Sequence, residues 1–329
     1  MGGRIILVLV LTSINLFAQE QEFRSQFKAM GSAFEVVIVA PKDSANWAEQ
    51  KLEFAKTEIE RIEKLISSWD PNSETSKVNA NAGLTHVTVG DELWQLTKRC
   101  LAISALTEGA FDITYAGMAS IWNFDKKNRK RWPDSALVKE KLPLVNYENV
   151  WLQTDSTITL AKKGMRIGFG GIGKGYAADI VMLALRQQGV KSGVVNASGD
   201  LYAWGTDAKG EAWKTAIVDP LDKRKVRMWL AISEKAIVTS GDYEKYKLKD
   251  DKRYAHIIDP KTGYPTSGIM SATVIAPKTE LADALATSLF VLGVDKGLSL
   301  INRLSGVECI IIDDSNEIHY SKNVEALIY

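Results

Sequence analysis

The densest group of residues suited to chemistry is a glycine cluster, Gly168-Phe-Gly-Gly-Ile-Gly-Lys174-Gly-Tyr-Ala-Ala-Asp179, which opens a predicted helix. Backbone N–H groups and the positive end of a helix dipole favour an anion at such a place. Lys174 supports this interpretation, because a cation at a helix start opposes the dipole unless an anion compensates it. The cluster therefore predicts a phosphate site, with an ordinary glycine-rich turn as the alternative.

The same cluster formally matches two well-known nucleotide-binding patterns, G-x-G-x-x-G and G-x-x-x-x-G-K. A P-loop needs Ser or Thr after its lysine to hold magnesium, and Gly175 stands there. A dinucleotide fold needs an acidic residue about 20 positions later, where the chain has Val194-Val-Asn-Ala197. We therefore expect neither fold, and a nicotinamide oxidoreductase is disfavoured.

A second cluster, Tyr254 to Pro265, contains a histidine and a carboxylate. A predicted strand runs into the tight turn Asp259-Pro-Lys-Thr-Gly263, which brings His256 and Asp259 near each other. Near neutral pH a histidine can act as a base or donate to a phosphate. A surface or core histidine is the alternative, and it is the interpretation we adopt for His86 and His319.

The third cluster is Ala282-Asp283-Ala-Leu-Ala-Thr287, which lies in a predicted helix. The i,i+4 spacing puts the carboxylate of Asp283 and the hydroxyl of Thr287 on one face, among small residues that leave room for an ion. Hard oxygen ligands of this kind suit Mg²⁺ paired with substrate phosphates. The alternative is an acidic residue that only complements the helix dipole.

The remaining motifs are less specific. Ser198-Gly199-Asp200 and Thr239-Ser-Gly-Asp-Tyr243 each read as a small-residue turn that ends a strand and could line a pocket. Cys100 and Cys309 fall inside apolar patterns of a predicted helix and a predicted strand, so we expect core thiols. No convincing Ser-His-Asp or Cys-His set is found in the sequence.

The elements that must position these residues follow from the spacing of apolar side chains. From Val150 onward short strands dominate, whereas long amphipathic patterns predict helices in both halves of the chain. Strand clusters with separate helices favour an α+β fold with largely antiparallel sheets and flanking helices. The basic, turn-rich stretch 125–141 is expected to be a surface excursion. The expected elements are a strand at 34–39, helices at 44–66, 91–107 and 174–188, helices after Thr279 and after Asp295, and a strand at 309–313.

Composition and the N-terminal segment limit the classes of protein to which this sequence can belong. The formal charge of +1, from 41 basic and 40 acidic residues, gives no field that would hold a polyanion, so nucleic acid is not an expected partner. Arg4, the apolar run Ile5–Leu11 and the small residue Ala18 predict a secretory signal peptide over residues 1–18. The apolar stretch is shorter than the roughly 20 residues of a membrane-spanning helix. Without a cysteine near the cut to accept a lipid, we expect a soluble, periplasmic protein of residues 19–329.

Eight segments in chain order form a pattern that no single motif gives, namely Ala29–Ser32, Ser67–Glu74, Gly109–Thr114, Gly170–Ala177, Ser198–Asp200, Ser240–Asp242, His256–Pro260 and Ala282–Thr287. In this order, with compatible gaps, they resemble the ApbE family of FAD:protein FMN transferases. The resemblance covers about Met30 to Asp313, nearly the whole chain after the predicted signal peptide.

The resemblance implies an α+β fold of two closely joined lobes with the flavin between them. It also implies FAD as the donor substrate, Mg²⁺ at its pyrophosphate, and a Thr or Ser hydroxyl of an exported protein as the acceptor, for instance in a redox-complex subunit. AMP would leave. The same residues would serve an FAD pyrophosphatase, in which water replaces the acceptor, and a non-enzymatic flavin carrier is a third alternative.

Site residues are implied position by position. His256 matches the position that serves catalysis, assisted by Asp259 and Lys174, and Gly168 stands where the family commonly has Asp, so a side-chain contact to FAD is in doubt there. The metal would be held by Asp283, Thr287, the position of Ala286 and the backbone carbonyl of Gly171. The flavin contacts would come from Met30, Trp69 (at a place that the family often fills with tyrosine), Phe111, Asp112, Ile113, Gly168, Lys174, Ser240, His256 and Ile257.

Overall fold

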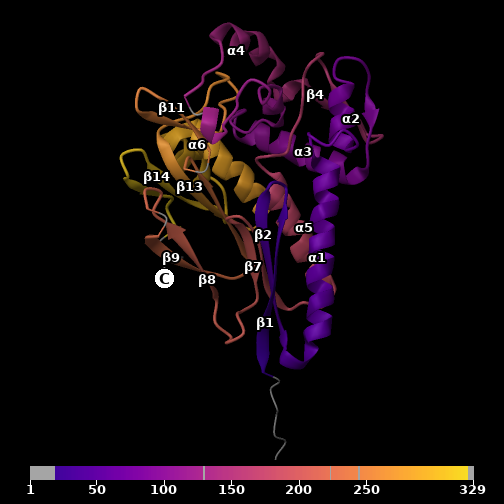
Figure 1. Ribbon diagram of the computed structural model, residues 1–329, viewed down its shortest axis with the longest axis vertical. Coiled ribbons are helices and arrows are strands. Elements are labelled where there is room, and N and C mark those ends of the chain that lie inside the picture. Colours follow the sequence, from indigo (N-terminus) through magenta and orange to yellow (C-terminus); the bar gives the residue numbers. More distant parts are fainter. Residues whose placement is uncertain (1–18, 129, 223, 244, 325–329) are drawn as a thin grey trace, which may run out of the picture.

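The computed structural model describes residues 19–128, 130–222, 224–243 and 245–324 (Figure 1). Helices pack against antiparallel sheets, so the predicted α+β class is confirmed at that level. The predicted signal peptide, residues 1–18, lies outside the described residues.

An eight-stranded sheet, antiparallel at every pairing, forms the centre of the molecule, in the order β1-β2-β6-β7-β10-β13-β14-β15. All eight residues of β13 are buried, as expected for a strand covered on both faces. The strands span β1 (Glu20–Ala29), β2 (Ser32–Pro41), β6 (Ser192–Ala197), β7 (Asp200–Trp204), β10 (Lys235–Gly241), β13 (Ile269–Ala276), β14 (Glu308–Asp313) and β15 (Ile318–Tyr320).

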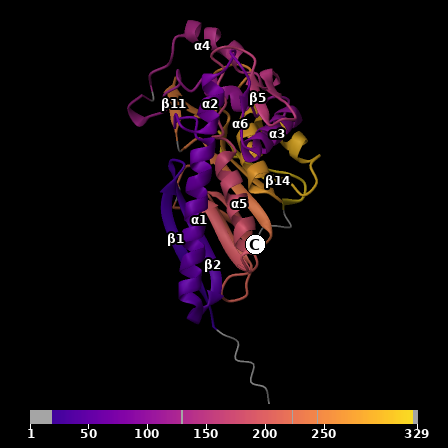
Figure 2. The ribbon, with the colours of Figure 1, turned by 90° about the vertical axis from the view of Figure 1, so that its right-hand side faces the viewer.

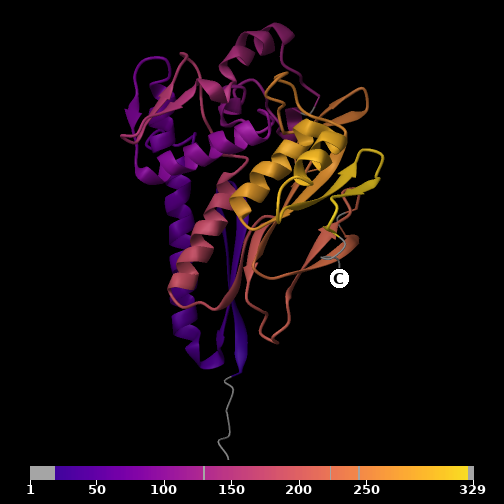
Figure 3. The same cartoon turned by 180° about the vertical axis from the view of Figure 1, so that it is seen from behind.

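Three long helices cover one face of this sheet (Figure 3). They are α1 (Ala45–Ile66), which runs along the β1–β2 hairpin (Figure 2), α5 (Gly173–Gln187) and α6 (Thr279–Ile301). Gly293 has φ 76° and ψ 178° and breaks α6, so the two helices predicted in this region are present on either side of it. By length and composition α6 would suit a membrane span, but half of the apolar stretch is buried inside the molecule, as in a core helix.

The opposite face of the sheet is covered by a hairpin of β8 (Trp213–Val218) and β9 (Val226–Ile232). Its inward side chains, among them Ile217 and Leu230, pack on Val37 and Ile275 of the sheet. The sheet therefore separates a large core under the helices from a smaller core under this hairpin.

The remaining elements gather beyond one end of the main sheet, at the top of Figure 1. The stretch 125–141 is a surface excursion, as predicted, although Val138 is buried. These elements are α2 (Glu74–Ala80), α3 (Asp91–Leu106), α4 (Ser135–Lys141), the small sheet β3 (Val87–Thr88), β5 (Thr157–Leu160) and β4 (Val150–Leu152), the hairpin β11 (Tyr246–Lys249) and β12 (Lys252–Ala255), and short 3₁₀ turns at 113–117, 126–128, 142–144 and 147–149. A further 3₁₀ turn, at 42–44, joins β2 to α1 at the other end of the sheet.

Several elements were not predicted, among them β1, α2, β3 and α4. Residues 20–29 look like a polar stretch in the sequence, yet they form β1, because pairing with β2 and the packing of Phe23 and Phe27 outweigh their low strand propensity. The short α2 was also missed. Cys100 and Cys309 are fully buried, as expected, and burial raises the pKa of the Cys309 thiol to about 12 and that of Cys100 above its usual range as well.

Candidate active site

A cavity of about 640 Å³ lies where the β1–β2 turn, the β6–β7 turn, the end of β10, the start of α5 and the middle of α6 meet. Segments of the chain from residue 30 to residue 287 contribute to its wall. Its lining includes Met30, Trp69, Phe111, Asp112, Tyr115, Gly170, Gly171, Lys174, Asp200, Thr239, Ser240, Lys245, His256, Ile257, Pro260, Asp283 and Thr287.

Lys174 lies in the first turn of α5 with its ammonium between two carboxylates. Its Nζ forms an ion pair with Asp200 Oδ2 and lies 3.7 Å from Asp283 Oδ2. Both carboxylates are almost completely buried. The predicted phosphate site is thus a helix start with a lysine, held in place by acidic side chains from β7 and α6.

Close packing of α5 on α6 sets the position of Asp283. Its Oδ2 accepts a hydrogen bond from the backbone N–H of Gly175, at 3.1 Å. A Cβ on Gly175 would lie 2.4 Å from the carbonyl oxygen of Thr279, so only glycine allows the two helices to approach this closely. The place that a P-loop would give to Ser or Thr is therefore a packing glycine here.

The oxygens suited to a divalent cation lie on one side of the cavity. Asp283 and Thr287 are one turn apart on α6, and a Cβ on Gly171 would lie only 3.2 Å from Thr287 Oγ1, which puts the backbone of Gly171 beside that hydroxyl. Carboxylate, hydroxyl and carbonyl oxygens are the donors that Mg²⁺ prefers, so this set fits the ion. Ala286 is fully buried and does not line the cavity.

His256 follows β12 and is fixed by its backbone, whose N–H donates to the Lys245 carbonyl oxygen at 3.0 Å. Its ring meets Phe124 edge to face, with 6.3 Å between centroids. The Nδ1 atom is buried without a hydrogen-bond partner among the described residues. Burial, with a smaller effect from Lys245, lowers the pKa of His256 to about 4. The imidazole is therefore neutral at neutral pH.

Among the described residues, no hydrogen bond or ion pair joins Asp259 to His256. Its carboxylate accepts hydrogen bonds from the Lys261 N–H at 2.8 Å and the Thr262 hydroxyl at 3.1 Å. Pro260 lines the cavity, whereas Asp259 does not. The expected assistance to His256 has no support in this geometry, because the turn uses the carboxylate itself.

Several of the predicted flavin-contacting residues line the cavity. Met30, at the β1–β2 turn with φ 51°, Phe111, Ser240 and Ile257 lie on its wall, and the Trp69 side chain is 79% exposed at its edge. An aromatic face in that position is available for stacking on a planar ring.

Asp112, Ile113 and Gly168 serve the local fold. The Asp112 carboxylate accepts hydrogen bonds from the Thr114 N–H and hydroxyl and from the Tyr147 N–H, and burial raises its pKa. Asp112 lines the cavity, whereas Ile113 and Gly168 do not. The Gly168 N–H donates to the Ile113 carbonyl, and a Cβ on Gly168 would lie 3.0 Å from Ala116 Cβ. The chain thus has little room for the Asp that the family commonly places there.

Several residues that line the cavity were not assigned a site role from the sequence, among them Asp200, Tyr115 and Lys245. Asp200 belongs to a turn that the sequence marked as part of a pocket, and nothing marked it as the partner of Lys174. Tyr115 is half-buried, and desolvation of its hydroxyl raises its pKa; a Cβ on Gly170 would lie 2.4 Å from that hydroxyl. Lys245 stands in a charged, exposed stretch with no local motif.

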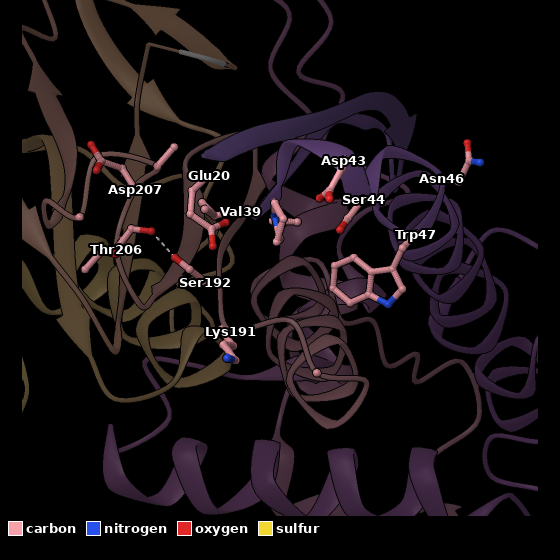
Figure 4. A pocket seen from close by; sticks show the side chains of 15 residues that line it. Glu20, Val39, Asp43, Ser44, Asn46, Trp47, Lys191, Ser192, Thr206 and Asp207 are labelled. Carbon is pink, nitrogen blue, oxygen red and sulfur yellow. Dashed lines mark hydrogen bonds between the residues drawn. The ribbon is translucent and has the colours of Figure 1, made fainter. Parts of the chain in front are cut away.

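A second cavity, of about 770 Å³, lies at the opposite end of the sheet (Figure 4). The ten residues of β1 separate the two cavities by roughly 30 Å. The polar groups there serve local turns: Ser192 donates to the Thr206 carbonyl, and Asp207 accepts from the N–H groups of Lys209 and Glu211 at 2.9 Å. None of the predicted site residues lines it, so the smaller cavity is the candidate site.

Comparison with known proteins agrees with this geometry. The family model described as "ApbE family" matches residues 30–311. The chain belongs to the ApbE family. The resemblance found in the sequence is thereby confirmed over most of the chain.

Named ApbE relatives align along most of their length. The "FAD:protein FMN transferase" of Treponema pallidum (strain Nichols) is 29% identical, over 97% of this chain and 93% of the relative. That of Klebsiella pneumoniae (strain 342) is 31% identical, over 79% and 81%. The solved ApbE protein of Thermotoga maritima superposes with a TM-score of 0.86 at 29% identity, covering 94% of this chain and 100% of the other. Pseudomonas stutzeri flavinyl transferase ApbE gives 0.84 at 28%, covering 95% and 98%.

Proposed function

We propose that this ApbE-family chain is an FAD:protein FMN transferase that moves FMN from FAD to a Thr or Ser hydroxyl of an exported protein and releases AMP. The relatives from Treponema pallidum and Klebsiella pneumoniae are FAD:protein FMN transferases, which supports the activity. The observation that carries the proposal is one cavity that brings together Lys174, Asp283, Thr287 and His256. These residues come from three separate sequence motifs.

The chain supplies a binding surface for each part of FAD. The diphosphate lies at the start of α5, where the N–H groups and the Lys174 ammonium face an anion. Aromatic and apolar side chains of Trp69, Phe111 and Ile257 hold the rings. The flavin then lies between the main sheet with its helices and the smaller elements beyond its end, as two closely joined lobes would hold it.

Mg²⁺ would be held by Asp283, Thr287 and the carbonyl oxygen of Gly171. When bound, such an ion neutralises charge on the diphosphate. Lys174 adds a second positive charge on the same side.

His256 handles the proton. The acceptor oxygen forms a bond to the FMN-side phosphorus, the bond from that phosphorus to the bridging oxygen breaks, and AMP leaves with that oxygen. The hydroxyl proton passes to the neutral imidazole of His256.

The deciding experiment incubates residues 19–329 with FAD, Mg²⁺ and candidate exported proteins and weighs each protein by mass spectrometry. An FMN-sized adduct on a Thr or Ser supports transfer. Free FMN and AMP without any adduct would assign the chain as an FAD pyrophosphatase. Intact FAD bound to unmodified protein would assign it as a flavin carrier. The same series without Mg²⁺ tests the metal requirement.

Export is a separate part of the proposal. The predicted signal peptide implies that the protein works outside the cytoplasm, where exported acceptors fold. Fractionation followed by N-terminal sequencing should give a periplasmic protein that begins near Gln19. A full-length cytoplasmic protein would contradict this location and leave the activity untouched.

A further inference from the structure

Positive charge is concentrated beside the His256 side of the cavity. Residues 125–132 contain five Lys and Arg and one Asp, and residues 245–253 contain five Lys and Arg and two Asp. Together these two segments, here called the basic rim, have a formal charge of +7. Since the whole chain has +1, all other residues together have −6. The near-neutral total therefore hides a strongly basic region.

Specific contacts hold the two halves of the basic rim together. Lys247, only 2% exposed, donates from Nζ to the carbonyl oxygens of Asn128 at 2.9 Å and Arg131 at 2.7 Å. Trp132 Nε1 donates to the Leu248 carbonyl oxygen at 3.2 Å. A buried lysine needs such partners, so this one fixes the excursion to β11.

The basic rim reaches the cavity at its mouth. Phe124, one residue before the rim, packs edge to face on His256, and Lys245 lines the cavity and holds the His256 backbone through its carbonyl.

Much of the rim's charge faces solvent. Arg253 pairs with Asp242 at 3.2 Å and Lys252 lies 3.9 Å from Asp314, so these two bases already have acidic neighbours. The exposed bases Lys127, Lys130, Arg131, Lys245 and Lys249 form the outward charge, with the acidic residues Asp125, Asp250 and Asp251 among them.

We infer that the basic rim is the docking surface for the acceptor protein, and that it selects a hydroxyl-bearing segment flanked by Asp and Glu. This rests on the proposed transfer activity, because an acceptor hydroxyl must reach the His256 side of the cavity. Complementary charge steers a partner and fixes its orientation, and the effect falls as salt screens it beyond about 8 to 10 Å.

The test uses two synthetic acceptor peptides with one central Thr. In the first, the Thr is flanked by Asp and Glu, and in the second by Asn and Gln. With FAD, Mg²⁺ and low salt, the wild-type chain should label the acidic peptide with a kcat/KM roughly tenfold higher than that of the neutral peptide. The advantage should shrink at high salt.

Two charge-reversal variants locate the effect. K127E/K130E changes two exposed lysines of the basic rim and should remove the preference, with a roughly tenfold loss on the acidic peptide and little change on the neutral one. The matched control, K191E/K209E, reverses two exposed lysines near the opposite cavity and should stay within about twofold of wild type. FAD affinity should be equal in all three proteins.

Several results would overturn the inference. The first is equal labelling of the acidic and the neutral peptide by the wild-type chain. The second is equal labelling of the acidic peptide by K127E/K130E and K191E/K209E. The third is a wild-type chain that labels a whole protein but neither peptide. A further outcome concerns other partners. If the wild-type chain binds phosphatidylglycerol vesicles or RNA, and K127E/K130E loses that binding but still labels the peptides as the wild type does, the basic rim serves a membrane or a nucleic acid. Failure of the proposed function looks different, because no acceptor of any kind would then carry FMN.

Discussion

Asp283 is the residue on which most contacts of the site converge. Its carboxylate accepts from the Gly175 N–H, lies 3.7 Å from the Lys174 ammonium and shares a helix face with Thr287. If it holds the metal, Asp283→Ala should lower the transfer rate roughly a hundredfold to a thousandfold, measured as FMN adduct per minute. Asp295→Ala removes an exposed acid from the same α6 and should leave the rate unchanged. Full Mg²⁺-dependent activity in Asp283→Ala would remove Asp283 from the metal site.

His256 should leave a signature in the pH dependence of stability. Its folded-state pKa of about 4 lies below the ordinary 6.5, so the unfolded chain takes up the proton first as the pH falls. The free energy of unfolding should therefore decrease between pH 6.5 and pH 4, by at most about 3 kcal/mol from this group.

His256→Gln removes the titrating group and serves as the comparison. Urea unfolding at several pH values should show a smaller decrease in the free energy of unfolding for the variant between pH 6.5 and pH 4. Above pH 6.5, the plots of this free energy against pH should be parallel for the two proteins. Identical pH profiles for the two proteins would mean that the imidazole is solvated in the folded state.

At the scale of elements, the contact between α5 and α6 builds the site. Gly175→Ala would place a methyl group 2.4 Å from the Thr279 carbonyl oxygen and 2.9 Å from Asp283 Cβ. Moving the helices apart should lower the free energy of unfolding by about 1 to 3 kcal/mol, and transfer should fall because Asp283 shifts. Leu183→Ala, on the exposed side of α5, should change neither quantity appreciably. A Gly175→Ala protein with wild-type stability and rate would show that this contact is not needed.

Elements whose apolar side chains repeat regularly were predictable from sequence. The spacing from Leu52 to Ile66 gave α1 nearly to the residue, and Gly293 separates the helices predicted on either side of it. By contrast, β1 exists because of its pairing with β2, which no local pattern of Glu, Arg and Gln reveals.

The site was predictable where chemistry is local. The motifs containing Lys174, His256 and Asp283 each predicted a role, and the structure brings them to one cavity. Sequence could not show that the Asp259 carboxylate serves its own turn, or that the Asp112 carboxylate binds Thr114 and the distant Tyr147 N–H. Nor could it show that Asp200 and Lys245 arrive from distant strands and loops. Such assignments depend on long-range packing.

For the molecule as a whole, the cavity exists only when the entire fold is formed, because its wall runs from Met30 to Thr287. FAD with Mg²⁺ should therefore raise the temperature of a single unfolding transition, by the equivalent of about 2.7 kcal/mol at 100 times the dissociation constant. Differential scanning calorimetry measures this shift. In Asp283→Ala, Mg²⁺ should add nothing to the effect of FAD. A ligand-induced shift confined to one of two separate transitions would contradict a site shared by the whole fold.

The pairing of Lys174 with Asp200 also bears on how a reaction cycle would end. In the proposed reaction, an arriving diphosphate would compete with the Asp200 carboxylate for the Lys174 ammonium, and two linked phosphate groups compete better than one. After the bond between the two phosphate groups breaks, each product has a single phosphate, and the Asp200 carboxylate can pair with Lys174 again. Competition from this carboxylate would therefore favour release of AMP and leave the site ready to bind the next FAD.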